Sequence, residues 1–143
     1  MQDNPEDPQY LLNLCAIVAL SLGRTTVDSK DILFVLASRT ELASYKLLEE
    51  YDKIDEIRKG LVYVMDFPSV VELPKESARM AFRGVAAKVV GQARRSYAKD
   101  QGLPGSVHLL YGVFASSDTA DVLQSCGITL ESLKMCAEKY RSA

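Results

Sequence analysis

His108, the only histidine of the chain, and the cysteines Cys126 and Cys136 are the residues that could support nucleophilic catalysis. That chemistry needs a thiolate, a base within hydrogen-bond reach of it, and a third group that orients the base. No spacing in the sequence brings these three parts together. We therefore expect no catalytic cysteine, and we expect His108 to lie in the first turn of a short helix and to contact the first half of the chain.

The three cysteines, Cys15, Cys126 and Cys136, show neither a CxxC pair nor the spacing of metal ligands, and each stands among apolar neighbours. An odd number of such residues is typical of free thiols in a reducing compartment. The sequence therefore predicts buried, unreactive thiols rather than disulfides or a metal centre.

Phosphate-binding and metal-binding patterns are also missing from the sequence. The glycine-flanked stretch GVAAKVVG, residues 84–91, lacks the lysine followed by serine or threonine that holds phosphates and magnesium in a P-loop. The acidic run around residues 49–56 lacks the alternating ligand order of a calcium loop, so we interpret it as solvated surface. We expect no ATPase activity, no cofactor and no metal.

The segment from Lys75 to Lys99 has the strongest local charge, with seven basic residues against Glu76 alone. On a helical projection its apolar residues gather on one face and the bases flank that face. One interpretation is a solvated rim whose long side chains cover the edge of the core. The other is a docking strip for an acidic partner. Binding of this strip to nucleic acid is a less well supported hypothesis than binding to an acidic protein, because few aromatic residues are interleaved with the basic residues.

Length and composition indicate one domain with one hydrophobic core. The chain has 143 residues, of which 48% are hydrophobic, and a formal net charge of −2. Its longest apolar run, residues 11–22, is too short to span a bilayer and contains Asn13. Acidic residues precede that run where a secretory signal would be basic. We therefore expect a cytoplasmic protein that does not insert into membranes.

Capping residues predict a series of helices and no strands. Asp7, Pro8 and Gly23 delimit the first helix, and Gly127 and Thr129 separate the last two. We expect the other caps at Ser29, Thr40, Asp52 or Asp55, Ser106 and Ser117. The expected helices cover residues 8–22, 30–37, 41–51, 53–65, 75–99, 107–115, 118–126 and 130–140. In the long segment 75–99, either Gly84 or Gly91 could mark a break or a place of close packing.

The sequence repeats itself internally. At one constant offset, Ser29, Ile32 and Leu33 match Ser106, Leu109 and Leu110, and after a slight contraction the pair 47–48 matches 122–123. This period is too long for a solenoid. We therefore predict an all-α fold of two pseudo-repeated four-helix units packed as one domain over residues 1–143. Repeat one covers about 8–65, a linker about 66–74, and repeat two about 75–143.

These residues resemble a known family, the Clp amino-terminal repeat, which occurs twice at the front of Clp-type AAA+ unfoldases. Similarity covers roughly Pro8 to Tyr140 and is best at Ser106, His108, Leu109, Leu110 and Gly112. The resemblance implies an all-α, non-catalytic module that docks substrate or adaptor proteins onto an unfoldase. It also implies either a stand-alone accessory protein or the front domain of a longer one. The alternative hypothesis is a helical DNA-binding or regulatory interaction protein.

The family resemblance implies ligand sites at the starts of equivalent helices, one per repeat. In members that recognise phosphorylated arginine, a glutamate stands where this chain has Lys30 and Val107, so we expect no phosphoarginine binding. We expect an acidic or uncharged protein partner instead. The predicted partner-binding residues are Glu6, Ser29, Lys30, Asp31, Lys75, Arg79, Ser106, Val107 and His108.

Overall fold

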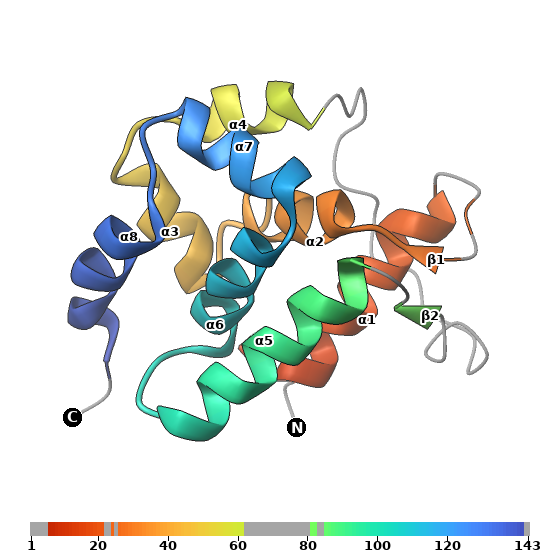
Figure 1. The fold of residues 1–143 in the computed structure, drawn as a ribbon, viewed down its shortest axis with the longest axis horizontal. Helices are drawn as coiled ribbons and strands as arrows, with labels where there is room; N and C mark the ends of the chain where they lie inside the picture. The colour runs from red at the N-terminus through yellow and green to blue at the C-terminus, as the bar shows by residue number, and fades with distance from the viewer. Residues whose placement is uncertain (1–5, 22–23, 25, 62–80, 83–84, 142–143) are drawn as a thin grey trace.

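Helices form almost all of the regular structure in the computed structural model of the protein (Figure 1). The structure describes residues 6–21, 24, 26–61, 81–82 and 85–141. The α-helices of this part of the chain are α1 (Pro8–Ser21), α2 (Ser29–Leu36), α3 (Ala43–Glu49), α4 (Ile54–Gly60), α5 (Val85–Lys99), α6 (Gly105–Gly112), α7 (Ser117–Ser125) and α8 (Leu130–Ala137). Two 3₁₀ turns, η2 (Val113–Ala115) and η3 (Glu138–Tyr140), extend α6 and α8. The predicted all-α class is confirmed.

One feature of the fold departs from the expected helices. Strand β1 (Thr26–Val27) pairs in parallel with strand β2 (Ala81–Phe82), with Thr26 opposite Ala81 and Val27 opposite Phe82. The helical pattern predicted over 75–99, in which Gly84 or Gly91 could mark a break, is therefore wrong at residues 81–82, and α5 begins at Val85. Helical spacing of apolar residues could not foresee this, because a strand pair between distant segments depends on tertiary packing. The predicted linker, 66–74, lies outside the described residues.

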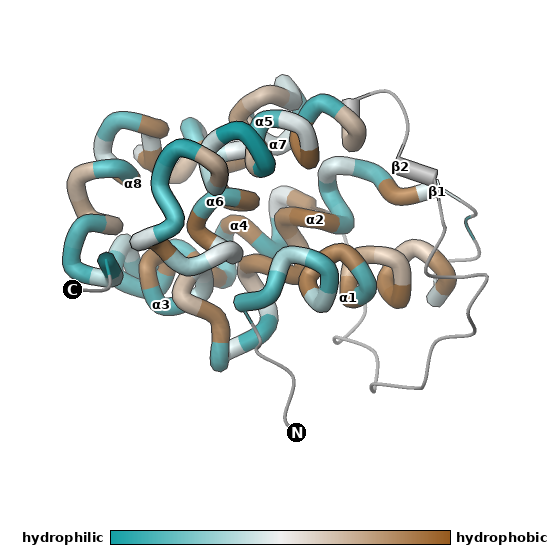
Figure 2. Tube along the Cα trace, turned by 90° about the horizontal axis from the view of Figure 1, so that it is seen from below, coloured by the Kyte–Doolittle hydropathy of each residue, from teal (hydrophilic) through white to brown (hydrophobic). Residues whose placement is uncertain are grey.

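Two central helices, α2 and α6, lie inside the protein. All eight residues of α6 are buried, and in α2 every residue except Lys30 is buried. Ile32, Leu33 and Leu110 have no exposed surface, and Leu109 is only 4% exposed. Figure 2 shows hydrophobic residues running along α1 and α2. A single core joins residues from both parts of the chain.

The starts of the helices can be compared between the first and the second part of the chain. The helices α1 to α4 begin at Pro8, Ser29, Ala43 and Ile54, and the helices α5 to α8 begin at Val85, Gly105, Ser117 and Leu130. The distance in sequence from one helix start to the next is therefore nearly the same in the two parts of the chain.

Three predicted helix boundaries rest on local chemistry and are confirmed. The carboxylate of Asp7 accepts a hydrogen bond from the Tyr10 backbone nitrogen at the start of α1, at 3.1 Å. Gly127 ends α7 with φ +78°, a left-handed conformation that favours glycine. Thr129 caps α8, where it forms a capping box with Ser132.

Gly23, the predicted end of the first helix, lies outside the described residues, and the remaining predicted caps are wrong. Asp28, not Ser29, caps α2, because its carboxylate accepts from Lys30 and Asp31 completes a capping box. Leu42 replaces Thr40 before α3, Lys53 replaces Asp52 or Asp55 before α4, Pro104 replaces Ser106 before α6, and Ser116 replaces Ser117 before α7. Asp52 instead takes a left-handed φ of 56°, which aspartate tolerates better than most residues, and turns the chain between α3 and α4.

In the part of the chain that the structure describes, no helix combines the length and the apolar character needed to cross a lipid bilayer.

Candidate protein-binding surface

Glu6 connects the starts of α3 and α6. Its Oε1 accepts a hydrogen bond from the backbone nitrogen of Ser106, and its Oε2 accepts from that of Ala43, both at 2.9 Å. Neither helix has a side-chain cap of its own, since Leu42 and Pro104 stand at the capping positions. One carboxylate therefore supplies the acceptor for both helix starts, and its negative charge faces the positive ends of both helix dipoles.

Ser106 completes this arrangement, which we call the helix-start junction and define as Glu6, Ala43, Ser44 and Ser106. The Ser106 hydroxyl accepts from the backbone nitrogen of Ser44 at 3.0 Å, and the Ser44 hydroxyl donates to the carbonyl of Leu36 at 3.0 Å. Both serines are completely buried. The hydroxyl of Ser106 thus serves the neighbouring helix rather than its own.

Gly105 is required for the chain to approach this closely. A Cβ atom at this position would lie 2.2 Å from the backbone oxygen of Glu6, a distance that real Cβ atoms do not show. The backbone around Glu6 is therefore seated directly against the start of α6. A partner that reached Ser106 or Val107, which are both fully buried, would first have to displace this segment.

The corresponding residues at the start of α2 are also committed to internal contacts. Ser29 is 2% exposed, and its hydroxyl lies 2.9 Å from that of Ser116 at the start of α7. Asp31 is completely buried and forms a two-pronged ion pair with Arg24, at 2.5 and 2.8 Å. Lys30 is half-buried. Among the described residues predicted to bind a partner, none is fully exposed.

His108 is held by both of its ring nitrogens. The Asp100 backbone oxygen, 2.7 Å from Nε2, can only accept, so Nε2 carries the proton and Nδ1 accepts from the Ser96 hydroxyl at 2.6 Å. Burial lowers the pKa of this imidazole, which favours the neutral ring. His108 lies in the first turn of α6, as predicted, but its hydrogen bonds run to residues 96 and 100 rather than to the first half of the chain.

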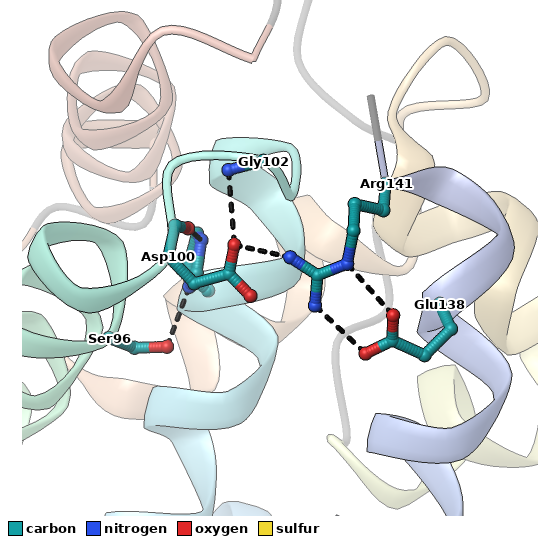
Figure 3. A network of polar contacts seen from close by, with 6 residues as sticks. Ser96, Asp100, Gly102, Glu138 and Arg141 are labelled. Atoms are coloured by element: carbon teal, nitrogen blue, oxygen red, sulfur yellow. Dashed lines mark hydrogen bonds and ion pairs between the residues drawn. The ribbon is translucent and has the colours of Figure 1, made fainter. Parts of the chain in front are cut away.

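Arg141 links the end of the chain to the turn after α5. Figure 3 shows its guanidinium between two carboxylates: Nη1 donates to Asp100 at 2.5 Å, and Nε donates to Glu138 at 2.8 Å. These hydrogen bonds hold the pKa values of Asp100 and Glu138 below their usual range and raise the pKa of Arg141. The same Asp100 carboxylate also accepts from the Gly102 backbone nitrogen at 3.1 Å.

The outer face of α5 carries a group of exposed cations, Lys88, Arg94, Arg95 and Lys99. Within the described residues none of the four forms an ion pair. Arg94 also borders a partly open cavity of about 90 Å³, whose walls include Leu12, Val90, Ala93 and Leu109. Lys75 and Arg79, predicted to belong to this basic surface, lie outside the described residues.

The acidic residues around α3 and α4 border a second cavity, of about 320 Å³, lined by Glu49, Asp52, Asp55 and Glu56 among others. Over the described ranges, no three histidine, cysteine or carboxylate side chains are grouped as metal ligands. This cavity lies apart from the cations of α5 in the sequence and in the fold.

The cysteines are free, but they are not equally protected. Cys15 is fully buried, and burial raises the pKa of its thiol far above the usual range. Cys126 and Cys136 are half-buried, so the prediction of three buried thiols is wrong for these two. The Tyr51 hydroxyl donates a hydrogen bond to the Cys136 sulfur at 3.8 Å. The ring nitrogens of His108 are both bonded to other groups, the Ser96 hydroxyl and the Asp100 backbone oxygen.

Of the nine predicted site residues, the structure brings Glu6 and Ser106 together at the helix-start junction. Val107 is buried in the first turn of α6, and Ser29, Lys30 and Asp31 lie at the start of α2. Sequence reasoning missed Ser44 and Ser116, whose partners are 62 and 87 residues away. It also missed Asp28, which the pattern Asp-x-x-Asp could have revealed as a capping box. Comparison with models of known protein families and with curated protein sequences finds no match for the chain.

Proposed function

We propose that the chain is a non-catalytic protein-binding module that docks substrate or adaptor proteins for a Clp-type AAA+ unfoldase. The observation that carries this proposal is the matched order of two sets of four helices around one core, with nearly equal spacing of their starts. This spacing agrees with the sequence repeat, in which Ser29 corresponds to Ser106, that resembles the Clp amino-terminal family. The proposed architecture is therefore a pair of four-helix units related by approximate twofold symmetry.

The contacts of the chemically versatile residues support a binding role rather than catalysis. Both nitrogens of His108 are engaged, with Ser96 and with the Asp100 backbone, so neither is available to activate a thiol. Cys15 is buried in the core. A module of this kind would act by recognition, and no covalent bond of the partner would change.

The partner is proposed to bind without phosphoarginine. A guanidinium ligand needs a carboxylate, but Val107 is apolar and buried, and Lys30 would repel a cation. The nearby Asp31 is already paired with Arg24. A buried charge left without its counter-charge typically costs more than about 2 kcal/mol, which is enough to weaken binding by more than about tenfold.

The DNA-binding alternative has less support. A helix-turn-helix protein must present one helix to the major groove. The two most regular candidates, α2 and α6, are the central buried helices and have no free face of that size.

The proposal can be tested by affinity purification of the tagged full-length chain from cells that make it naturally. A Clp-type AAA+ ATPase, or a protein that acts with one, is expected to co-purify and to be identified by mass spectrometry. A tagged helical protein of similar size and charge is the control. Salt-dependent retention on DNA with no specifically co-purifying protein would favour the alternative.

A further inference from the structure

Helix α5 presents a positively charged face to the solvent. Its fifteen residues include four cations and no acidic residue, although the whole chain has a net charge of −2. The cations Lys88, Arg94, Arg95 and Lys99 are all exposed, and no ion pair engages them within the described residues. The opposite face of the helix, with Ala86, Val89 and Ala93, is buried in the core. Figure 1 shows α5 along the outside of the molecule.

The cations are aligned along the helix. At about 100° per residue, Lys88, Arg95 and Lys99 fall within a sector of about 40°, and they extend over about 16 Å of helix. Such a row matches an extended or helical segment with acidic residues at intervals of one or two turns. An isolated small anion would use only part of it.

Small residues lie between this row and Arg94. Ala87 and Ala98 are exposed there, and a Cβ at Gly91 would meet nothing nearer than the Arg95 guanidinium, at 4.0 Å. Gly91 therefore has no packing role inside the protein, although glycine weakens a helix interior by about 1 kcal/mol relative to alanine. The low ridge formed by Ala87, Gly91 and Ala98 leaves room for another backbone to approach closely.

Beyond this ridge, Arg94 borders the cavity of about 90 Å³ between α1, α5 and α6. Leu12, Val90 and Ala93 provide apolar walls. An apolar cavity of about 150 Å³ accepts benzene, so this smaller cavity suits a branched aliphatic side chain. A cation, a small-residue ridge and an apolar cavity therefore lie next to one another on one side of α5.

We propose that the outer face of α5 binds an acidic polypeptide segment that carries one branched aliphatic anchor residue. The acidic side chains pair with Lys88, Arg95 and Lys99, the backbone crosses the ridge at Gly91, and the aliphatic side chain enters the cavity beside Arg94. This inference rests on the proposed protein-binding function, and it names the chemistry of the partner.

The face fits a polypeptide better than a nucleic acid. Single-stranded nucleic acids bind through stacking on exposed aromatic rings as well as through cations. Tyr97, the aromatic residue of α5, is half-buried and packs edge-on against His108 at 5.5 Å between ring centroids. It offers no flat exposed platform for a base.

Fluorescence anisotropy with the full chain can test the proposal. The probe is a short labelled peptide in which glutamates surround a single leucine, and the comparison peptide carries serine in place of that leucine. We expect the leucine peptide to bind about tenfold more tightly than the serine peptide, because only leucine fills the cavity. We also expect its affinity to fall as NaCl increases from about 50 to about 200 mM.

Two variants locate the site. Lys88→Glu combined with Lys99→Glu should weaken binding of the leucine peptide by about tenfold or more. Lys46→Glu combined with Lys59→Glu changes two exposed cations of α3 and α4 and gives the same net charge. That control should change the affinity by less than about twofold. Gly91→Gln adds bulk to the ridge where a Cβ meets open space, so it should weaken binding by about tenfold without lowering the melting temperature.

Several outcomes would overturn the inference. Equal loss of affinity in the α5 variant and the control would show that only net charge matters. Equal affinity for the two peptides would show that no aliphatic side chain binds in the cavity. Tighter binding to a labelled oligothymidylate than to the leucine peptide would indicate a nucleic-acid-binding surface. If the α5 variant still co-purifies the same cellular partner as the wild type, this inference fails while the proposed function stands. If the wild-type chain captures no partner, the proposed function fails.

Discussion

The carboxylate of Glu6 lies 2.9 Å from the backbone nitrogen of Ser106, although one hundred residues separate the two in sequence. The same side chain accepts from Ala43 at the start of α3. The segment before α1 is thereby joined to the starts of two helices, one from each part of the chain. Glu6 was predicted to contact a partner, and the structure places its carboxylate against the protein's own backbone.

Glu6→Ala should therefore destabilise the protein. The substitution removes two charge-assisted hydrogen bonds and leaves two helix N–H groups without their acceptor, so we expect a loss of about 1.5–3 kcal/mol in the free energy of unfolding. Urea denaturation followed by circular dichroism measures it. Glu41→Ala removes an exposed carboxylate paired with Arg39 and should cost less than about 1 kcal/mol. Similar losses for both variants would contradict the bridging role of Glu6.

Two helical glycines should respond to alanine with opposite signs. Gly105→Ala places a Cβ against the Glu6 backbone oxygen and should destabilise by about 1–3 kcal/mol. Gly91→Ala adds a methyl group in open space and should stabilise by up to about 1 kcal/mol through helix propensity. Thermal unfolding of the two variants beside the wild type gives both signs in one experiment. Destabilisation by Gly91→Ala would reveal an internal packing role for that position.

His108 should make stability depend on pH below about 6.5, the ordinary pKa of histidine. Its folded-state pKa is lowered by burial, so the unfolded chain binds the proton more readily. Stability is therefore complete above the unfolded pKa of about 6.5 and falls as the pH decreases toward the folded pKa. Because His108 is the only histidine, His108→Gln should remove most of this slope. Urea midpoints of the wild type and of His108→Gln, measured at several pH values, test the expectation. If the variant keeps the same dependence of stability on pH, other titratable groups cause it.

Arg141→Ala should raise the pKa values of Asp100 and Glu138, since its guanidinium is the main cause of their lowering. NMR titration of the side-chain carboxyl carbons follows both groups separately. Arg141→Lys keeps the positive charge but loses the planar, two-sided geometry of the guanidinium. It should therefore retain only part of the lowering of the Asp100 and Glu138 pKa values. Carboxyl pKa values that stay low in Arg141→Ala would mean that other groups maintain them.

The three thiols should react at different rates with a mild alkylating reagent. Cys15 is buried and its pKa is raised, so it should be modified only when the protein unfolds. Half-buried Cys126 and Cys136 should react first. Peptide mass spectrometry after timed quenching distinguishes the three positions. Complete modification of any one thiol within seconds at neutral pH would reopen the enzyme hypothesis.

Local chemistry determined much of what the sequence by itself could predict. Asp7, Gly127 and Thr129 act on backbone groups close to them in the chain, so their roles as helix boundaries follow from their positions in the sequence. The periodic apolar residues likewise indicated helices and one shared core, because burial of a helix face depends mainly on the spacing of its residues. The internal repeat led to the prediction of two four-helix units, which stays a prediction.

Tertiary structure decided which partner each polar group found. The hydroxyls of Ser29 and Ser106 were expected to cap their own helices, but they lie against the hydroxyl of Ser116 and the backbone nitrogen of Ser44. Glu6 takes over the capping role from a distance, and Thr26–Val27 pairs with Ala81–Phe82 in place of a predicted helix. Once packing buries a helix start, every N–H there must be bonded, and the acceptor is whichever group the fold brings within reach. Sequence spacing carries no information about such long-range encounters.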